Sequence, residues 1–457
     1  MHYFKILLEI MCLSIGSHKL THSTEKPKTK VCVVHPHIFT ERHANRHLDA
    51  LLEEALNLTA ALPDLDVVHS RLVTLKQMRP ATLLGAGVVE ELKEVIKAEK
   101  IGLAIVNGSL TPIQQRNLEK AWNCKVIDRT GLILEIFGER ASTKEGELQV
   151  ELAALTYQRS RLVRTWTHLE RQRGGHGFTG GPGEKQLEID RRLIDVRILR
   201  LKKDLEKIKK TRSLHRKARK KVPYPIVALV GYTNAGKSTL FNRLTGADVL
   251  AEDMLFATLD PTMRALKLPS GVQVVLSDTV GFISDLPTSL VAAFRATLEE
   301  VLEADIIVHV RDISHEDTNA QAQDVRDVLK ELGVDYDSAK HVIEVWNKMD
   351  LLDPEGAESL QERAARQEKA ALCASALTGT GERLFLQLVE EKLLRDFCEV
   401  QACLELWDAK SLAWFHENTT IIKKNTTDEF VQIQALVRPA QVKSMHSFPL
   451  KSLEINK

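Results

Sequence analysis

Residues 231–238 read Gly-Tyr-Thr-Asn-Ala-Gly-Lys-Ser and come directly after the apolar run 225–230. The octamer fits G-x-x-x-x-G-K-[ST], whose glycines let backbone N–H groups converge on phosphate oxygens at the start of a helix. In this pattern Lys237 reaches the β- and γ-phosphates, and the Ser238 hydroxyl binds Mg²⁺. A chance turn before a helix is the alternative, and the buried-type strand in front of the octamer disfavours it. The residues therefore predict a nucleotide phosphate site.

Two later segments would sense the third phosphate of the nucleotide. The run 272–277 is a predicted strand that ends in Asp278-Thr-Val-Gly281. Asp278 would hold Mg²⁺ through water, and the Gly281 N–H would contact the γ-phosphate. Between this segment and the phosphate loop, Phe256-Ala-Thr-Leu-Asp-Pro261 is expected to be a first switch, in which Thr258 closes over Mg²⁺.

The base would be read by two further strand ends. The strand 342–346 delivers Asn347-Lys-Met-Asp350, and the Asp350 carboxylate can accept two hydrogen bonds from guanine N1–H and its amine, which adenine cannot offer. The segment 375–377 would place a backbone N–H on guanine O6. Four motifs in this order, each at a strand end, predict a guanine-nucleotide domain built on a doubly wound sheet.

These motifs define the expected site for GTP or GDP. The expected catalytic residues are Lys237, Thr258, Gly281 and Asn234, and the expected Mg²⁺ ligands are Ser238, Thr258 and Asp278. The expected nucleotide contacts are Gly231, Tyr232, Thr233, Asn234, Ala235, Gly236, Lys237, Ser238, Thr239, Phe256, Ala257, Thr258, Leu259, Asp260, Asp278, Thr279, Val280, Gly281, Asn347, Lys348, Met349, Asp350, Ser375, Ala376 and Leu377.

The residue after Gly281 is Phe282, where many small GTPases carry a Gln that orients the attacking water. A phenyl ring cannot orient water, so intrinsic hydrolysis is expected to be slow. Asn234 is a candidate ligand for a K⁺ ion that would stand in for an arginine finger. The alternative, that Asn234 only tolerates the loop backbone, is equally favoured.

Composition limits the class of protein. A chain of 457 residues suggests about three domains, and its 63 basic and 62 acidic residues nearly cancel. The six cysteines lack a C-x-x-C pair, and no run of 18 apolar residues predicts a membrane span. The first residues, with Lys5 and Glu9 in an apolar stretch, favour a disordered leader over a targeting signal. We expect a monomer in the cytoplasm, with partial membrane association left open.

A helical hairpin is predicted in front of the nucleotide domain. Leucines and isoleucines recur at heptad spacing in 148–169 and again in 187–208, which predicts an antiparallel coiled coil. Residues 186–221 hold fifteen Lys/Arg against five Asp/Glu, which favours a nucleic-acid backbone contact over a solvated face. The tip 174–183 has six glycines in ten residues. His176 and Phe178 in this tip could stack on unpaired RNA bases, and a flexible linker is the alternative.

The expected organisation has five parts. They are a disordered leader (1–29), an N-terminal α/β domain (30–140), the hairpin (141–221), a GTPase domain (222–395) and a small α+β domain with a disordered tail (396–457). The fold class is therefore α/β and multidomain. The histidines 35, 37, 43 and 47 lack partnering carboxylates, so surface histidines are favoured over a metal site.

The residues between about Val31 and Arg438 resemble the HflX-type GTPases, which are ribosome-associated members of the translation-factor-related P-loop class. The most specific strings are 128–137 (DRTGLILEIF), 146–153 (GELQVELA), 181–188 (GPGEKQLE) and the phosphate loop with 256–261. The resemblance implies that the N-terminal domain and hairpin sit in the large ribosomal subunit, with the tip near the peptidyl-transferase centre. It also implies that the GTP-bound form binds best and splits stalled ribosomes.

We therefore expect a GTPase whose partners are the large ribosomal subunit and its rRNA. A factor that assembles or remodels large-subunit rRNA, with the GTPase as a checkpoint, is the alternative. A metabolic P-loop kinase is a third hypothesis, which Asn347-Lys-Met-Asp350 disfavours.

Overall fold

The computed structural model describes residues 28–38, 46–166, 182–219, 224–247, 255–256, 258–259, 261–285, 300–334, 336, 341–366, 371–395, 397–427, 429–437, 441–442, 445 and 448–456. Within α6 and α7 the side chains of 163–166, 182–187, 209 and 212–219 are outside this description. The chain divides into two units. The first comprises Met1–Leu205, Met254–Leu259 and Asp285–Phe294, and the second comprises Glu206–Asp253, Asp260–Ser284 and Arg295–Lys457.

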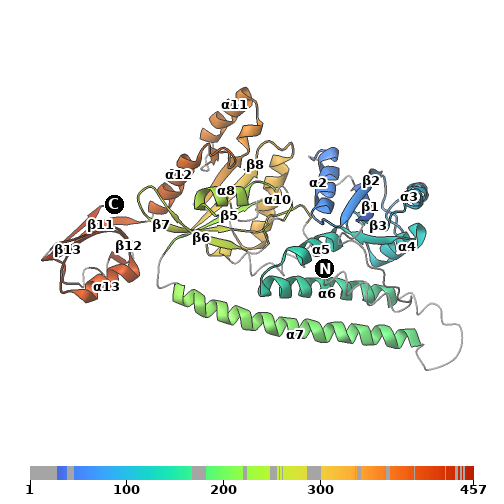
Figure 1. Cartoon of the computed structure of the whole chain (residues 1–457), viewed down its shortest axis with the longest axis horizontal. Helices are drawn as coiled ribbons and strands as arrows, with labels where there is room; N and C mark the ends of the chain where they lie inside the picture. Colours follow the sequence, from blue (N-terminus) through green and yellow to red (C-terminus); the bar gives the residue numbers. More distant parts are fainter. Residues whose placement is uncertain are drawn as a thin grey trace, which may run out of the picture. The chain divides into compact units, whose positions relative to one another are not determined.

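The first unit is built on a parallel sheet of order β2-β1-β3-β4 (Figure 1). Its strands are β1 (Thr29–Ile38), β2 (Leu65–Leu75), β3 (Leu103–Val106) and β4 (Lys125–Asp128). The connecting helices are α2 (Leu48–Ala60), α3 (Ala86–Ala98) and α4 (Pro112–Trp122), and α5 (Arg129–Arg140) follows β4. All four residues of β3 are buried, as expected for a strand covered on both faces. The α/β pattern predicted for this region is confirmed.

Local signals in the sequence fix the ends of these helices. Thr111 and Gln114 form a reciprocal capping box at the start of α4, and Pro112 occupies its first turn. The amide N–H of Gly131 bonds the side chain of Asp128, which caps α5. Each of these bonds satisfies a helix-end amide that has no partner within the helix.

Asp128, at the carboxyl end of β4, is also the centre of a buried polar network. Only 1% of its surface is exposed, and it pairs with Arg161 of α6. The Tyr157 hydroxyl donates to Asp128 Oδ1 at 2.6 Å, and the Leu110 N–H donates to Oδ2 at 3.3 Å. Burial and the neighbouring carboxylate raise the pKa of Tyr157, which therefore remains a hydrogen-bond donor. This network fixes α6 to the end of the sheet.

The interpretation of the histidines as surface residues is wrong for two of them. His35 and His37 lie on β1 and are 8% and 5% exposed, because β1 is an inner strand of the sheet. His35 Nδ1 lies 2.8 Å from the Asn107 amide nitrogen, and Asn107 Oδ1 accepts from Arg129 at 2.7 Å. His47 is exposed, and His43 lies outside the described residues.

The predicted hairpin consists of helices α6 (Lys144–Trp166) and α7 (Pro182–Arg219), which run side by side in Figure 1. Arg159 pairs with Asp195 at 3.1 Å and Arg197 pairs with Glu151 at 2.6 Å. Arg159 comes after Glu151 in α6, whereas its partner Asp195 comes before Arg197 in α7, so the two helices are antiparallel. The predicted heptad residues Ile198, Leu201 and Leu205 are all buried. Supercoiling stays a prediction, and residues 174–181 of the tip lie outside the described residues.

The second unit contains a six-stranded sheet of order β10-β9-β8-β5-β7-β6, parallel except for β6. Its strands are β5 (Ile226–Gly231), β6 (Thr262–Lys267), β7 (Gln273–Asp278), β8 (Ile306–Asp312), β9 (Val342–Asn347) and β10 (Ala371–Cys373). Helices α8 (Lys237–Thr245), α10 (Thr318–Glu331), α11 (Pro354–Ala365) and α12 (Glu382–Leu394) accompany it. The predicted doubly wound sheet is confirmed. The strand order diverges at β5, and ligands bind at such points in open parallel sheets.

The end of the chain forms an antiparallel sheet of order β12-β13-β11-β14 with helix α13 (Ala409–Asn418). Its strands are β11 (Cys398–Glu405), β12 (Thr420–Thr426), β13 (Phe430–Val437) and β14 (Ser452–Asn456). The expectation of a disordered tail is wrong, because Ser452–Asn456 pairs with β11. The alternation of Leu453 and Ile455 with polar residues is a strand pattern, short enough to be missed. No helix among the described residues is long and apolar enough to cross a bilayer.

The Asp128 network yields a prediction about stability. In Asp128→Asn, the largely buried guanidinium of Arg161 loses the negative charge of Asp128, so local unfolding around β4 and α5 should become easier by about 3 kcal/mol or more. The measurement is native-state hydrogen exchange of the amides of β4 and α5. The control is Asp195→Asn, which breaks the exposed Arg159 pair and should cost below about 1 kcal/mol. Equal effects of the two changes would contradict the assignment of Asp128 as the network centre.

Candidate nucleotide-binding site

The predicted phosphate loop runs from the end of β5 to the start of α8, at the carboxyl edge of the six-stranded sheet. Gly236 caps α8 with a left-handed backbone (φ +86°), and a Cβ there would lie 2.2 Å from Asn347 Nδ2. Only glycine suits both constraints. Asn234 is exposed and also left-handed (φ +60°), a conformation that asparagine adopts more readily than most residues. Asn234 therefore has the left-handed backbone conformation that its alternative role requires.

Lys237 lies inside the loop and is 6% exposed. Its ammonium donates to the Tyr232 carbonyl oxygen at 2.7 Å. Burial lowers the pKa of Lys237 to about 8, and the nearby Asp278 carboxylate partly opposes this. A lysine in so poorly solvated a place gains most from an anionic partner, which is what a nucleotide phosphate supplies.

Ser238 and Asp278 meet where α8 begins and β7 ends. The Ser238 hydroxyl donates to Asp278 Oδ2 at 2.7 Å, and Asp278 is fully buried. A hydroxyl beside a carboxylate is an oxygen donor set that suits Mg²⁺. No group of three or more His, Cys, Asp or Glu that could hold a metal occurs among the described residues. Ser238 and Asp278 would therefore supply only part of the coordination of a Mg²⁺ ion at this place, and a bound nucleotide would supply phosphate oxygens.

The segment after β7 lies directly against the phosphate loop. The Thr233 N–H donates to the Phe282 carbonyl at 2.7 Å, and the Phe282 N–H donates to the Gly231 carbonyl at 3.0 Å. A Cβ on Gly281 would come within 2.8 Å of Thr233 Cγ2 and 3.1 Å of Lys237 Nζ. The Phe282 side chain is 1% exposed. Its ring is packed inside the domain and cannot orient a water molecule.

One carboxamide connects the segments predicted to contact guanine to the phosphate loop. Asn347 Nδ2 donates to the Ala235 carbonyl at 2.8 Å, and Asn347 Oδ1 accepts from the Ala376 N–H at 2.9 Å. Lys348 has a left-handed backbone (φ +65°) and pairs with Asp312 at the end of β8, at 2.8 Å. Asp350 lies in the 3₁₀ turn Met349–Leu351 and is exposed. The structure thus brings together the phosphate loop, the N-K-x-D segment and Ser375–Leu377.

Arg243, which the motifs did not reveal, and Thr279 of the D-x-x-G segment support this arrangement. Arg243 of α8 donates to the Leu377 and Thr378 carbonyls, both at 3.0 Å, and pairs with Glu382 at 3.1 Å. Thr279 is buried, and its hydroxyl donates to the Leu229 carbonyl at 2.6 Å. Arg243 lies six residues after Lys237 on the same helix, and no sequence motif indicates its contacts.

The predicted first switch is described in part. The segment Met254–Leu259 belongs to the first unit, where Phe256 meets Phe137 edge-on with ring centroids 4.6 Å apart. Thr258 and Leu259 are buried. Ala257 and Asp260 lie outside the described residues. The roles of Thr258 as a Mg²⁺ ligand and catalytic residue stay predictions.

Comparison with known proteins identifies the family. Three family models match the chain, namely the GTP-binding GTPase N-terminal region (49–138), the GTP-binding GTPase middle region (140–219) and the 50S ribosome-binding GTPase domain (226–348). GTPase HflX of Magnetococcus marinus is 50% identical over 390 residues, which cover 85% of this chain and 88% of that protein. The chain belongs to the HflX family of GTPases. GTPase HflX of Escherichia coli is 45% identical over 340 residues, covering 74% of this chain and 78% of that protein.

An HflX-family chain with this site is a GTPase that binds GTP and GDP. Among solved structures, a GTP-binding protein from Sulfolobus solfataricus in complex with GDP matches 80% of this chain and 99% of its own, with 23% identity and a TM-score of 0.42.

The Arg243 contacts yield a prediction about nucleotide affinity. Arg243→Ala removes two charge-assisted bonds to the loop that follows Ser375, so GDP should bind on the order of tenfold more weakly. Titration with a fluorescent GDP analogue measures this change. The control is Arg383→Ala, an exposed arginine beside Glu382, which should leave affinity unchanged. If both variants bind GDP as tightly as the unaltered chain, Arg243 does not position the guanine loop.

Proposed function

We propose that this HflX-family GTPase binds the large ribosomal subunit in its GTP form and splits or rescues stalled ribosomes in the cytoplasm. The observation that carries the proposal is the helical hairpin α6–α7, which coincides with the matched middle region of the family. A GTPase that acted only on free nucleotide would have no use for a long basic helix directly before its nucleotide domain in the chain.

The surface of α7 supports a role in binding a large partner. Ile189, Leu193, Val196 and Leu199 recur at helical spacing and are 50–66% exposed, whereas Ile198 and Leu201 are buried. An apolar row left in water on a charged helix is typical of a docking surface. The net charge of +10 in residues 186–221 adds attraction for phosphate backbones. The basic side chains from Arg212 onward lie outside the described residues.

The nucleotide would act as a switch on this hairpin. A Cβ on Gly281 would crowd Thr233 and Lys237, so the Gly281 backbone lies close to the phosphate loop, and a γ-phosphate bound by Lys237 would meet the Gly281 N–H. Ser238 and Asp278 would hold Mg²⁺, and Thr258 would join them while the third phosphate is present. Such a switch requires that the partner binds the GTP and GDP forms with different affinity.

Hydrolysis is expected to be slow without the partner. Phe282 is buried against the phosphate loop, and no glutamine takes its place in orienting water. In this proposal the ribosome completes the catalytic arrangement around Lys237 and Gly281, so that hydrolysis follows binding and releases the factor.

Sedimentation of intact ribosomes with the full chain tests the proposal. With a non-hydrolysable GTP analogue, the chain should migrate with the large subunit and the amount of free subunits should rise. With GDP, binding should be weaker, because the γ-phosphate contacts are absent. Equal affinity in the two nucleotide states would contradict the proposal. Binding to immature large subunits, with intact ribosomes left unsplit, would favour the assembly-factor alternative.

A variant in the basic stretch 186–221 tests its contact with RNA. Changing Arg216, Lys217, Arg219 and Lys220 to Ala should flatten the salt dependence of RNA binding, in proportion to the number of phosphates that these side chains neutralise. Its GDP affinity should stay unchanged. An unaltered salt slope would show that these residues form a solvated face only.

Asn234 has two candidate roles, as a K⁺ ligand and as a residue that fits the left-handed loop backbone, and one substitution separates them. Glycine keeps the left-handed backbone but removes the side-chain oxygen that a K⁺ ion would need. We expect GTP hydrolysis by the unaltered chain to be faster in K⁺ than in Na⁺ at equal ionic strength, and Asn234→Gly to abolish the difference while keeping GDP affinity. If the unaltered chain hydrolyses GTP at the same rate in K⁺ and in Na⁺, Asn234 does not act through a K⁺ ion.

A further inference from the structure

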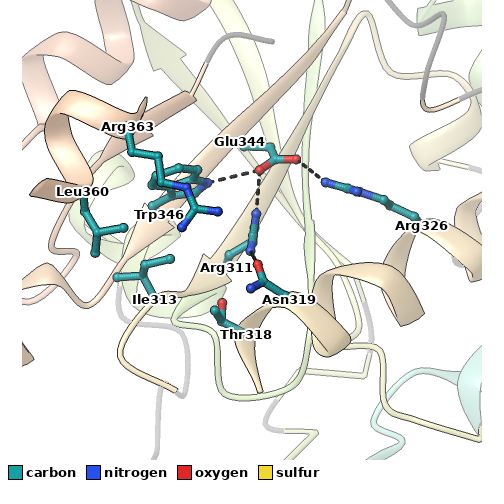
Figure 2. A pocket seen from close by; sticks show the side chains of 9 residues that line it. All are labelled: Arg311, Ile313, Thr318, Asn319, Arg326, Glu344, Trp346, Leu360 and Arg363. Carbon is teal, nitrogen blue, oxygen red and sulfur yellow. Dashed lines mark hydrogen bonds and ion pairs between the residues drawn. The ribbon is translucent and has the colours of Figure 1, made fainter. Parts of the chain in front are cut away.

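A pocket of about 330 Å³ lies in the second unit, lined by residues of β8, β9, α10 and α11 and of the segments that follow β8. Figure 2 shows its lining side chains: Arg311, Ile313, Thr318, Asn319, Arg326, Glu344, Trp346, Leu360 and Arg363. None of these residues belongs to the predicted nucleotide contacts. Its volume is at the lower end of what small-molecule sites occupy.

Positively charged side chains outnumber negatively charged ones in the lining of the pocket. Glu344 is its one carboxylate, is 5% exposed at its side chain, and faces three arginines that line the same space. Arg311 and Arg326 each donate to Glu344 at 2.9 Å. Burial acts to raise the pKa of Glu344, but the Arg311 guanidinium, together with hydrogen bonds from Trp346 and Tyr336, holds that pKa far below its usual range. The lining residues therefore carry a net charge of +2.

The acceptors of Glu344 are already fully used. Oε2 accepts from Arg311 and from Trp346 Nε1 at 3.1 Å, and Oε1 accepts from Arg326 and from the Tyr336 hydroxyl at 2.8 Å. A carboxylate offers about four acceptor positions, so Glu344 cannot also bind Arg363 without losing a partner. Arg363 is exposed to solvent, so its charge remains available to an anion that enters the pocket from solution.

Arg363 supplies the part of the pocket that is free to bind. Figure 2 shows its guanidinium turned toward Arg311 and Trp346 from the opposite wall. Among the described residues it has no ion-pair or hydrogen-bond partner, whereas Arg366 one turn later pairs with Glu362. Thr318 contributes a hydroxyl oxygen that is buried and unpaired within the described structure. Thr318 also opens α10, whose N-terminal end carries partial positive charge.

The side of the pocket next to Arg363 is apolar. Ile313, Leu360 and the ring of Trp346 form this wall, which Figure 2 shows beside the guanidinium of Arg363. A ligand that fits both walls combines a doubly charged anionic group with a small apolar body. Guanidinium groups bind phosphate oxygens in a bidentate manner, which makes a phosphate the best match for two arginines.

We propose that this pocket binds a small phosphate monoester as its dianion, in a site separate from the guanine-nucleotide site. The phosphate lies between Arg363 and Arg311 and accepts from the Thr318 hydroxyl, and the apolar group lies against Ile313 and Leu360. Arg326 and Glu344 hold Arg311 in place and do not themselves need to touch the ligand.

Phenyl phosphate is a suitable probe, used on the full chain loaded with Mg²⁺ and GDP so that the phosphate loop is already occupied. At about pH 7.5 it is mostly a dianion. We expect a saturable shift of the Trp346 indole N–H resonance, assigned with Trp346→Phe, and a smaller apparent affinity for inorganic phosphate, which lacks the apolar group. A phosphate diester, with a single charge, should bind more weakly still.

Arg363→Ala should weaken phenyl phosphate binding about tenfold. Arg366→Ala is the matched control beside the same helix and should leave the binding unchanged. GDP affinity should stay the same in both variants, because neither residue is among the guanine contacts. The absence of a saturable shift, equal binding in Arg363→Ala, or equal binding of the diester would each overturn the proposal. None of these outcomes bears on ribosome binding, so the two proposals fail independently.

Discussion

The carboxamide of Asn347 is the contact on which the nucleotide site depends most. It donates to the phosphate loop at Ala235 and accepts from Ala376, and only 2% of Asn347 is exposed. An aspartate could not donate to Ala235, and a hydrophobic residue would leave two buried backbone groups without partners, at about 1–3 kcal/mol each. The amide lies so close to Gly236 that no Cβ fits there. One side chain therefore sets the distance between the phosphate end and the guanine end.

The parallel sheet makes this arrangement possible. Strands β5, β8 and β9 are adjacent and parallel, so Gly231, Asp312 and Asn347 come to the same edge. A Cβ on Gly231 would lie 2.2 Å from the Val310 carbonyl, so the loop leaves β5 in close contact with its neighbour. Backbone packing of this closeness fixes the loop through main-chain contacts, so the loop conformation does not depend on the side chains of Lys237 and Ser238.

The motifs and the apolar strands made most of the fold predictable, because a buried parallel strand such as β5 is apolar along nearly its whole length. The residues of the phosphate loop, D-x-x-G and N-K-x-D could be predicted because each motif needs specific atoms at fixed spacing. Arg243 could not be predicted, because its partners are carbonyls that any residue offers, at positions 134 and 135 residues further along the chain. Strand β14 was missed because five residues give little periodicity.

The arginine pocket shares its strands with the guanine site, and this follows from the geometry of β8 and β9. Successive side chains of a strand point to opposite faces, so Glu344 and Trp346 face the pocket while Val345 faces the other way. Asn347 follows Trp346 directly, and Asp312, the partner of Lys348, follows Arg311 directly. Each strand thus carries a pocket residue immediately before a residue of the guanine end. If an anion in this pocket binds with different affinity in two nucleotide states, nucleotide affinity must change by the same factor when the anion is bound.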